Sequence, residues 1–271
     1  AIDKTKHEVL VFLDGCDDNS NELLSQFPTY NWLESSKSIG VSPARRILFE
    51  AAQGEILIGF DDDAHPLQQG FIDITKQLFL DNQNVAVLSF EEIKGIYDND
   101  HVALMNHIPD QSYLCNSFVG CGFAIRNDIY KQTAGFPEWM DIYGEEGCLS
   151  IEIIDKGYGI LYTSEISVNH RVDRQYRQTK GGNVFRFERQ LCNMALYFLV
   201  FYPANRLPRK WIKLFWHNFK KYALTDFNFF KAYVRGVFRF LLKVFQAWPA
   251  RNPVSKSTVK KINSLPHPKY G

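Results

Sequence analysis

The sequence lacks the features of secreted, disulfide-bonded and membrane-spanning proteins. Its 271 residues contain only five cysteines, none in a C-x-x-C spacing, which argues against a disulfide framework or a zinc cluster and favours a reducing compartment. No charged segment followed by an apolar one stands near the first residues, so we expect no signal peptide, while Ala at position 1 suggests processing, trimming or missing preceding sequence. The longest uncharged stretch, 190–205, has 16 residues and is broken by polar residues and Pro203, too short for a predicted membrane span.

Acidic residues are scarce in the last part of the chain. Residues 171–271 hold 3 acids against 21 Lys and Arg, a formal charge of +18, whereas residues 1–170 hold 27 acids against 10 bases, a charge of −17. The net charge of +1 conceals this division. Such asymmetry predicts that the two parts meet different partners, the basic part typically an anionic polymer or a membrane surface.

The first part of the chain alternates apolar runs with helical patterns. Residues 8–13 and 55–60 are short, β-rich apolar runs that end in acids, as buried strands do. Residues 42–53 between them have Ser42 and Pro43 at the start and Gly54 at the end, which indicates a helix. This strand-helix-strand order predicts an α/β fold with a parallel sheet. Further patterns predict helices at 69–80 and 146–156, strands at 85–90, 118–125 and 160–162, and irregular, polar structure at 91–117.

Acidic residues follow both of the first two predicted strands. Because ligands bind at the carboxyl ends of strands in open α/β sheets, we expect these acids to face one crevice. Asp61 and Asp63 form a D-x-D pattern that can present two carboxylates to one hard divalent cation. A solvated acidic turn is the alternative interpretation of so short a pattern.

The order of the motifs resembles that of the family 2 glycosyltransferases. An acid-ending strand and an Ala-Arg helix start precede the D-x-D, and a Gly-rich strand, Gly144-Glu145-Glu146 and Val168-Asn169-His170 follow it, in unbroken order over residues 8–171. The resemblance implies a GT-A fold, Rossmann-like with a mostly parallel mixed sheet flanked by helices. It also implies a nucleotide-sugar-dependent enzyme that inverts the anomeric centre. The first strand-helix unit of that family, on the order of 35 residues, has no counterpart before residue 8.

The resemblance assigns donor-binding residues. Asp14 matches the acid that contacts the nucleotide base, although Gly15 stands where members often have a second acid. Arg45 matches an arginine near the base or diphosphate. Asp61 and Asp62 are expected beside the nucleotide sugar, with a UDP-sugar as the favoured donor.

The resemblance also assigns the metal and the catalytic base. Asp61 and Asp63 match the metal-binding D-x-D, and His170 matches a late histidine that completes the metal site in several members. Carboxylates suit Mg²⁺ or Mn²⁺, and a histidine nitrogen suits Mn²⁺ somewhat better. Glu146 matches the proposed general base, but the adjacent Glu145 stays an alternative. Both glutamates can instead serve only to complement the dipole of the predicted helix.

The basic part of the chain reads as amphipathic helices rich in aromatic residues. The bases at 210, 213, 217 and 220, and those at 231, 235, 239 and 243, recur at helical spacing beside apolar residues. Helices of this type suit the surface of an anionic bilayer, so residues 206–248 are predicted to attach the protein peripherally to the cytoplasmic face of the membrane. Packing of the aromatic faces on the catalytic body is the alternative. Nucleic acid is not predicted as a partner, because no recognition motif accompanies the charge.

Together these features predict a catalytic domain at residues 1–184 and a helical extension at 185–271. The predicted activity is transfer of a sugar from a nucleotide diphosphate to a glycan or lipid-linked acceptor, as in polysaccharide biosynthesis. Two alternatives stay open. One is a sugar-phosphate nucleotidyltransferase, and the other is a catalytically silent module that binds a glycan or a membrane.

Overall fold

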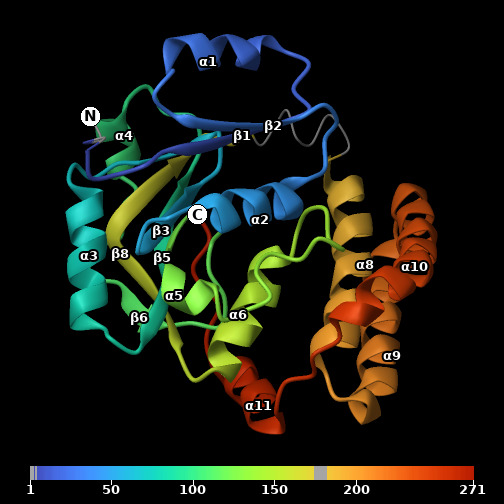
Figure 1. The fold of residues 1–271 in the computed structure, drawn as a ribbon. Helices are drawn as coiled ribbons and strands as arrows, with labels where there is room; N and C mark the ends of the chain where they lie inside the picture. Colours follow the sequence, from blue (N-terminus) through green and yellow to red (C-terminus); the bar gives the residue numbers. More distant parts are fainter. Residues whose placement is uncertain (1–2, 4, 174–181) are drawn as a thin grey trace.

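A computed structural model describes residue 3 and residues 5–173 and 182–271 of the chain. The protein has an α/β body with a group of helices on one side (Figure 1). The predicted α/β class is confirmed. The arrangement of the strands differs in several places from what the sequence predicts.

The N-terminal part forms a small parallel sheet of its own. Strands β1 (Leu10–Asp14) and β2 (Asn31–Ser35) pair with each other, and the connection between them contains η1 (Asn19–Glu22) and α1 (Leu23–Gln26). Helix α2 (Val41–Ala51) follows at nearly the predicted position. It begins after Gly40, whose φ is +95° and where a Cβ would lie 2.7 Å from the Asp141 carbonyl oxygen. Glycine at this position therefore lets α2 start close to the loop that leads into α6.

The main sheet is mixed. Its strands are β3 (Ile56–Phe60), β4 (Ala64–Pro66), β5 (Val85–Lys94), β6 (Ser112–Leu114), β7 (Gly122–Arg126) and β8 (Gly159–His170). The order is β3-β7-β5-β8-β4, with β6 also paired to β8. The longest ladder, β5 with β8, is parallel and has a register shift after Phe90. Strand β3 pairs with β7, and β1 and β3 are not hydrogen-bonded neighbours within the described residues. The strand-helix-strand unit predicted over residues 8–60 therefore does not form two adjacent parallel strands.

Three strand predictions need correction. Strand β5 continues through Lys94 instead of ending at residue 90, and β8 is one continuous strand instead of a short one at 160–162. Strand β7 starts at Gly122, four residues after the predicted start. The sequence misleads at β5 because Glu91 and Glu92 look like loop residues. Both are buried in the strand, where His107 and His170 bond to their carboxylates.

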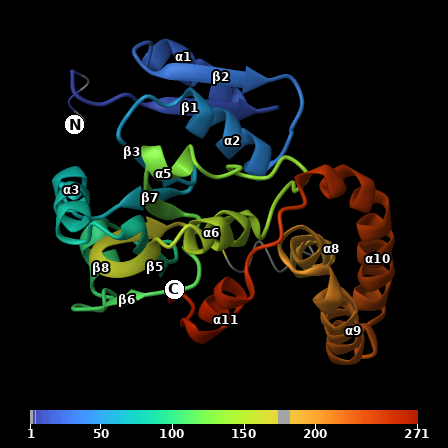
Figure 2. The same ribbon diagram turned by 60° about the horizontal axis from the view of Figure 1, so that its bottom comes forward.

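Helices cover the main sheet on both faces (Figure 2). The longer ones are α3 (Phe71–Asp81) and α6 (Glu145–Asp155), and the short ones are α4 (Asp100–Leu104) and α5 (Asn127–Tyr130). The core between α2, α6 and the sheet is aromatic. The ring of Phe49 in α2 stacks on that of Phe123 in β7, with 5.7 Å between the ring centroids, and it contacts the Phe136 ring edge-on. This packing holds α2 against β7.

The C-terminal helices form a group that is tied to the body. They are α8 (Gly182–Phe201), α9 (Leu207–Asn218), α10 (Phe227–Ala247) and α11 (Lys256–Ser264), with short helical turns at η2 (Ala204–Arg206), η3 (Phe219–Ala223) and η4 (Trp248–Ala250). Helix α10 packs closely on α8, since a Cβ on Gly236 would lie 3.1 Å from the Glu188 carbonyl oxygen. The Asn193 amide of α8 donates to the Ile142 carbonyl oxygen of the body at 2.7 Å. Helix α8 begins at Gly182, so the boundary predicted after residue 184 falls inside it.

The first predicted basic stripe lies on α9 and η3, and the second lies on α10. The basic face of α10 is not wholly solvated. Its Arg235 and Arg239 bind Glu188 of α8, and Lys243 donates to the Trp139 carbonyl oxygen of the body. The bases of α10 are thus partly used inside the protein. No helix within the described residues is long and apolar enough to cross a membrane.

Candidate active site

Asp61, Asp63 and His170 lie together at one end of the main sheet. The turn after β3 carries both aspartates, and β4 then pairs with β8 so that Ala64 stands opposite His170. His170 Nε2 is 3.2 Å from Asp63 Oδ1. One ligand atom from each of the three residues lies within 4.8 Å of the others. The structure therefore brings the three predicted metal ligands, one nitrogen and two carboxylates, close together.

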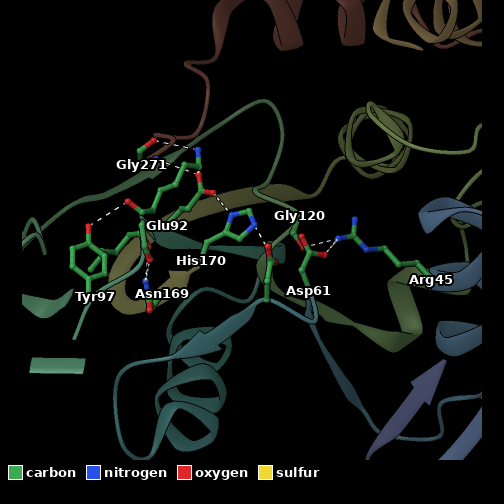
Figure 3. A network of polar contacts seen from close by, with 12 residues as sticks. Arg45, Asp61, Glu92, Tyr97, Gly120, Asn169, His170 and Gly271 are labelled. Carbon is green, nitrogen blue, oxygen red and sulfur yellow. Dashed lines mark hydrogen bonds and ion pairs between the residues drawn. The ribbon is translucent and has the colours of Figure 1, made fainter. Parts of the chain in front are cut away.

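Glu92 orients His170 from the other side. Figure 3 shows the imidazole between Glu92 and the aspartate turn, and His170 Nδ1 is 2.5 Å from Glu92 Oε1. Burial alone would raise the pKa of Glu92, but hydrogen bonds from His170 and Lys94 and their charges hold it below its usual value. A carboxylate that accepts the Nδ1 proton leaves the Nε2 lone pair for a metal ion, an arrangement common around metal-bound histidines.

Glu92, Cys121 and His170 form a second group with metal-ligand spacing. Two observations make it the poorer site. Burial raises the pKa of the Cys121 thiol far above its usual value, so the thiolate that binds metals is disfavoured. Glu92 already accepts from His170 and Lys94. The residues that fit a hard divalent cation are therefore Asp61, Asp63 and His170.

Arg45 lies at the centre of the acidic cluster. Its guanidinium is 2.5 Å from Asp61 Oδ1, 3.2 Å from Glu145 Oε1 and 3.5 Å from Glu146 Oε1, and it also donates to the Gly120 carbonyl oxygen at 2.8 Å. Burial alone would lower the pKa of Arg45, but these three carboxylates raise it. Arg45 thus links the D-x-D turn to the start of α6. Its predicted contact with the donor stays a prediction.

The two glutamates at the start of α6 differ in environment. The Glu145 side chain is 4% exposed and that of Glu146 is 22% exposed. Burial, reinforced by the charge of Glu146, raises the pKa of Glu145 to about 8, in spite of Arg45. Glu145 therefore holds its proton more tightly than a free glutamate does. Its Oε2 is buried with no hydrogen-bond partner among the described residues.

Gly120 leaves space for the side chain of Glu146. Gly120 was not predicted from the sequence as a site residue. A Cβ at Gly120 would lie 2.1 Å from Glu146 Oε1 and 3.0 Å from the Arg45 guanidinium. The glycine-rich stretch 118–125 was the available signal, since a glycine permits close approach. The sequence signal for Glu92 was weaker, because an acid just after a predicted strand is common in loops. Only its tertiary contacts with His170 and Lys94 indicate a role.

The remaining predicted donor residues lie at the edges of this site. The Asp14 carboxylate at the end of β1 accepts from the Ile39 and Gly40 backbone N–H groups, at 2.6 and 3.0 Å, and from Ser38 Oγ at 2.8 Å. Asp14 therefore already holds the loop before α2. The Asp62 side chain is exposed in the turn between the two candidate ligands.

Comparison of the sequence with known proteins gives a partial match. No protein-family profile matches the chain. An uncharacterised protein of Haemophilus influenzae is 31% identical over 131 residues, which span 45% of this chain and 65% of that protein. The match thus covers less than two thirds of the relative.

Solved structures of low sequence identity have a similar fold. TarS of S. aureus (residues 1–349) has a TM-score of 0.54 at 11% identity, with 92% of this chain and 83% of that chain covered. The mannosyltransferase PcManGT from Pyrobaculum calidifontis, in complex with GDP-Man and Mn²⁺, has a TM-score of 0.54 at 13% identity, covering 96% and 75%. GalNAc-T7 with UDP, GalNAc and Mn²⁺ has a TM-score of 0.50 at 12% identity, covering 76% and 48%. The chain has the GT-A fold of these glycosyltransferases.

Proposed function

We propose that the protein is a metal-dependent, inverting glycosyltransferase that uses a nucleotide-diphosphate sugar. One observation supports this most directly. Arg45 bonds both to Asp61 of the D-x-D turn, which lies beside His170, and to Glu146, a partly exposed glutamate. A cation site and a base are thus both held next to one arginine within a GT-A fold, an arrangement suited to a displacement reaction that needs both groups.

Asp61, Asp63 and His170 would hold Mn²⁺ or Mg²⁺. A bound divalent cation neutralises the charge that develops on a departing diphosphate. The chain's own groups are set for this, since Glu92 fixes the His170 ring and Arg45 supplies a further positive charge beside Asp61.

Glu146 is the proposed general base. It is the more exposed of the two glutamates, so an acceptor hydroxyl can reach it. Glu145 is almost completely buried, and burial raises its pKa to about 8, so it is the poorer candidate for contact with an acceptor hydroxyl. Removal of the acceptor proton by Glu146 is a step typically worth roughly 10²- to 10⁴-fold in rate. A hydroxyl that attacks the anomeric carbon from the side opposite the leaving diphosphate, while Glu146 takes its proton, would invert the anomeric centre.

The donor is proposed to be a UDP-sugar, placed by Asp14, Arg45, Asp61 and Asp62. The structures of similar fold contain UDP in one case and GDP-Man in another, so a nucleotide sugar is the class of ligand that this fold accommodates. The acceptor is proposed to be a glycan or a lipid-linked glycan, as polysaccharide biosynthesis requires.

An anionic membrane surface is the proposed second partner, contacted through residues 206–248. Helix α10 exposes one apolar stripe along its length, and apart from the adjacent Leu241 and Leu242 its members are three or four residues apart. The stripe consists of Phe227, Phe230, Val234, Phe238, Leu241, Leu242 and Phe245, between 39% and 83% exposed. Lys220, Lys221 and Lys231 are exposed, Lys231 lies over the ring of Phe227 in this stripe, and the charge of residues 171–271 is +18. Exposed apolar side chains with flanking bases fit the cytoplasmic face of a bilayer.

Donor turnover tests the proposed activity. Hydrolysis of UDP-sugars and GDP-sugars in the presence of Mn²⁺ should release nucleotide diphosphate with the wild type. Glu146→Gln should retain donor binding and lose turnover, whereas Asp61→Asn and Asp63→Asn should lose metal-dependent binding. Release of pyrophosphate from a nucleoside triphosphate and a sugar phosphate would instead favour a nucleotidyltransferase. Binding of vesicles or glycans without any turnover of nucleotide sugars would favour the catalytically silent binding module.

A further inference from the structure

Residues 265–271, here called the C-terminal segment, return from α11 to the catalytic body. The Asn116 backbone N–H donates to the Pro266 carbonyl oxygen at 2.9 Å, and the Asn116 side-chain amide donates to the Leu265 carbonyl oxygen at 3.2 Å. Tyr113 Oη donates to the His267 carbonyl oxygen at 3.3 Å. These bonds hold the segment along the loop between β6 and β7.

The C-terminal segment reaches Glu92, as Figure 3 shows. The Gly271 backbone N–H donates to Glu92 Oε2 at 3.2 Å. Lys94 Nζ donates to the Gly271 carbonyl oxygen at 3.2 Å and lies 3.2 Å from the same Glu92 oxygen. A Cβ on Gly271 would lie 2.3 Å from the Glu92 carbonyl oxygen. The segment therefore packs directly on the backbone of β5, with space for a glycine only.

Glu92 connects the segment to the candidate metal site. The Glu92 side chain is 3% exposed, and its second oxygen, Oε1, is 2.5 Å from His170 Nδ1. His170 Nε2 is in turn 3.2 Å from Asp63 Oδ1. Two hydrogen bonds thus separate Gly271 from a candidate metal ligand, and each Glu92 oxygen is held from a different side.

We propose that Glu92 and the C-terminal segment are positioning residues of the divalent-cation site, a proposal that rests on the function proposed above. A carboxylate anchored through both oxygens resists rotation, so His170 keeps its Nε2 directed at Asp61 and Asp63. Partners of this type affect metal affinity by roughly 10- to 100-fold. The segment acts through Glu92 and does not contact the ion.

The test measures Mn²⁺ alone, by electron paramagnetic resonance of the free ion. Gly271→Ala adds a methyl group that the Glu92 backbone excludes, and it should raise the Kd for Mn²⁺ roughly 10-fold. Glu92→Ala should raise it by up to about 100-fold, and Glu92→Gln, which retains an oxygen for the Nδ1 proton, should recover part of that loss. Lys269→Ala changes an exposed side chain of the same segment and should bind as the wild type.

A second readout separates positioning from general destabilisation. Nitrogen NMR of ¹⁵N-histidine protein without metal, recorded well below the melting temperature of each variant, should show His170 protonated at Nδ1 in the wild type and in Glu92→Gln, and a mixture of tautomers in folded Glu92→Ala. If Gly271→Ala and Glu92→Ala bind Mn²⁺ as the wild type does, the positioning proposal is wrong while the metal site stands. If the wild type binds no Mn²⁺, the metal-dependent function itself fails. Loss of binding in Glu92→Ala but not in Asp63→Asn would place the ion at the Cys121 group and also overturn the proposal.

Discussion

Replacing Phe238 and Phe245 of α10 with serine should release the protein from anionic vesicles. The two side chains are 62% and 83% exposed, and a phenylalanine offers roughly 200 Å² of mostly apolar surface. About 290 Å² of apolar area is therefore available to a bilayer, worth about 7 kcal/mol at 25 cal/mol per Å² if all of it left water. Docking at the interface buries part of this area, so about half, roughly 3.5 kcal/mol, is the expected loss. That corresponds to a weakening of between 10² and 10³-fold.

Vesicle flotation measures this effect directly. Wild-type protein should float with vesicles of phosphatidylcholine and phosphatidylserine, and less so with phosphatidylcholine alone or at high salt, because each base near an anionic surface contributes about 1 kcal/mol. Leu80→Ser is the matched control, since it removes an apolar side chain that is 67% exposed on α3 of the body. Equal flotation of the double variant and the wild type would refute the reasoning. The reasoning would also be refuted if the wild type bound no vesicles and formed a dimer that the double variant does not form, since the stripe would then be an interface between two copies of the chain.

Three further predictions concern the acidic cluster. Gly120→Ala should lower donor turnover roughly 10²-fold at a nearly unchanged melting temperature, because the added Cβ meets the flexible end of Glu146; full turnover would contradict the assigned base. Arg45→Met should cost about 3 kcal/mol in urea unfolding, since it leaves one buried acid, Glu145, and two partly exposed ones, Asp61 and Glu146, without their cation; the double variant with Glu145→Gln, which removes the buried acid, should recover part of this loss. Stability should fall as the pH rises from about 4.5 to about 8, because the folded state keeps Glu145 protonated while the unfolded state releases the proton. Glu145→Gln should flatten this dependence, by at most about 1.4 kcal/mol per pH unit, and an unchanged pH profile of the unfolding free energy would exclude the burial effect.

Sequence patterns anticipated the parts of the site that are local in the chain. Asp61 and Asp63 end an apolar run, and Glu145 and Glu146 begin a helix, so each pair is visible within a few residues. Their approach to Arg45 depends on the packing of α2 on β7 and α6, which no local pattern encodes. Glu92 was missed for the same reason. A buried acid inside a strand looks like a loop residue until His170 and Lys94 are seen to satisfy it.

The orientation of α10 was also beyond sequence patterns. Its apolar and basic residues both recur at helical spacing, so either face can be the inner one. The small residues Ala232 and Gly236 decide the matter, since they let the helix approach α8 closely. Arg235 then reaches Glu188 while Phe238 stays outside. The three-residue strand β4 was missed because it is too short to show any period.

Arg45 gives the site a resident counterion that is part of the covalent chain. The clustered carboxylates can fold without waiting for an external cation, since the guanidinium already neutralises part of their charge. An incoming divalent ion must then compete with Arg45 for Asp61, and the affinity measured for the ion is the difference between these two attractions. The protein without metal is accordingly expected to stay folded in the presence of a chelator. Its affinity for the metal ion should be modest until a bound diphosphate supplies additional negative charge.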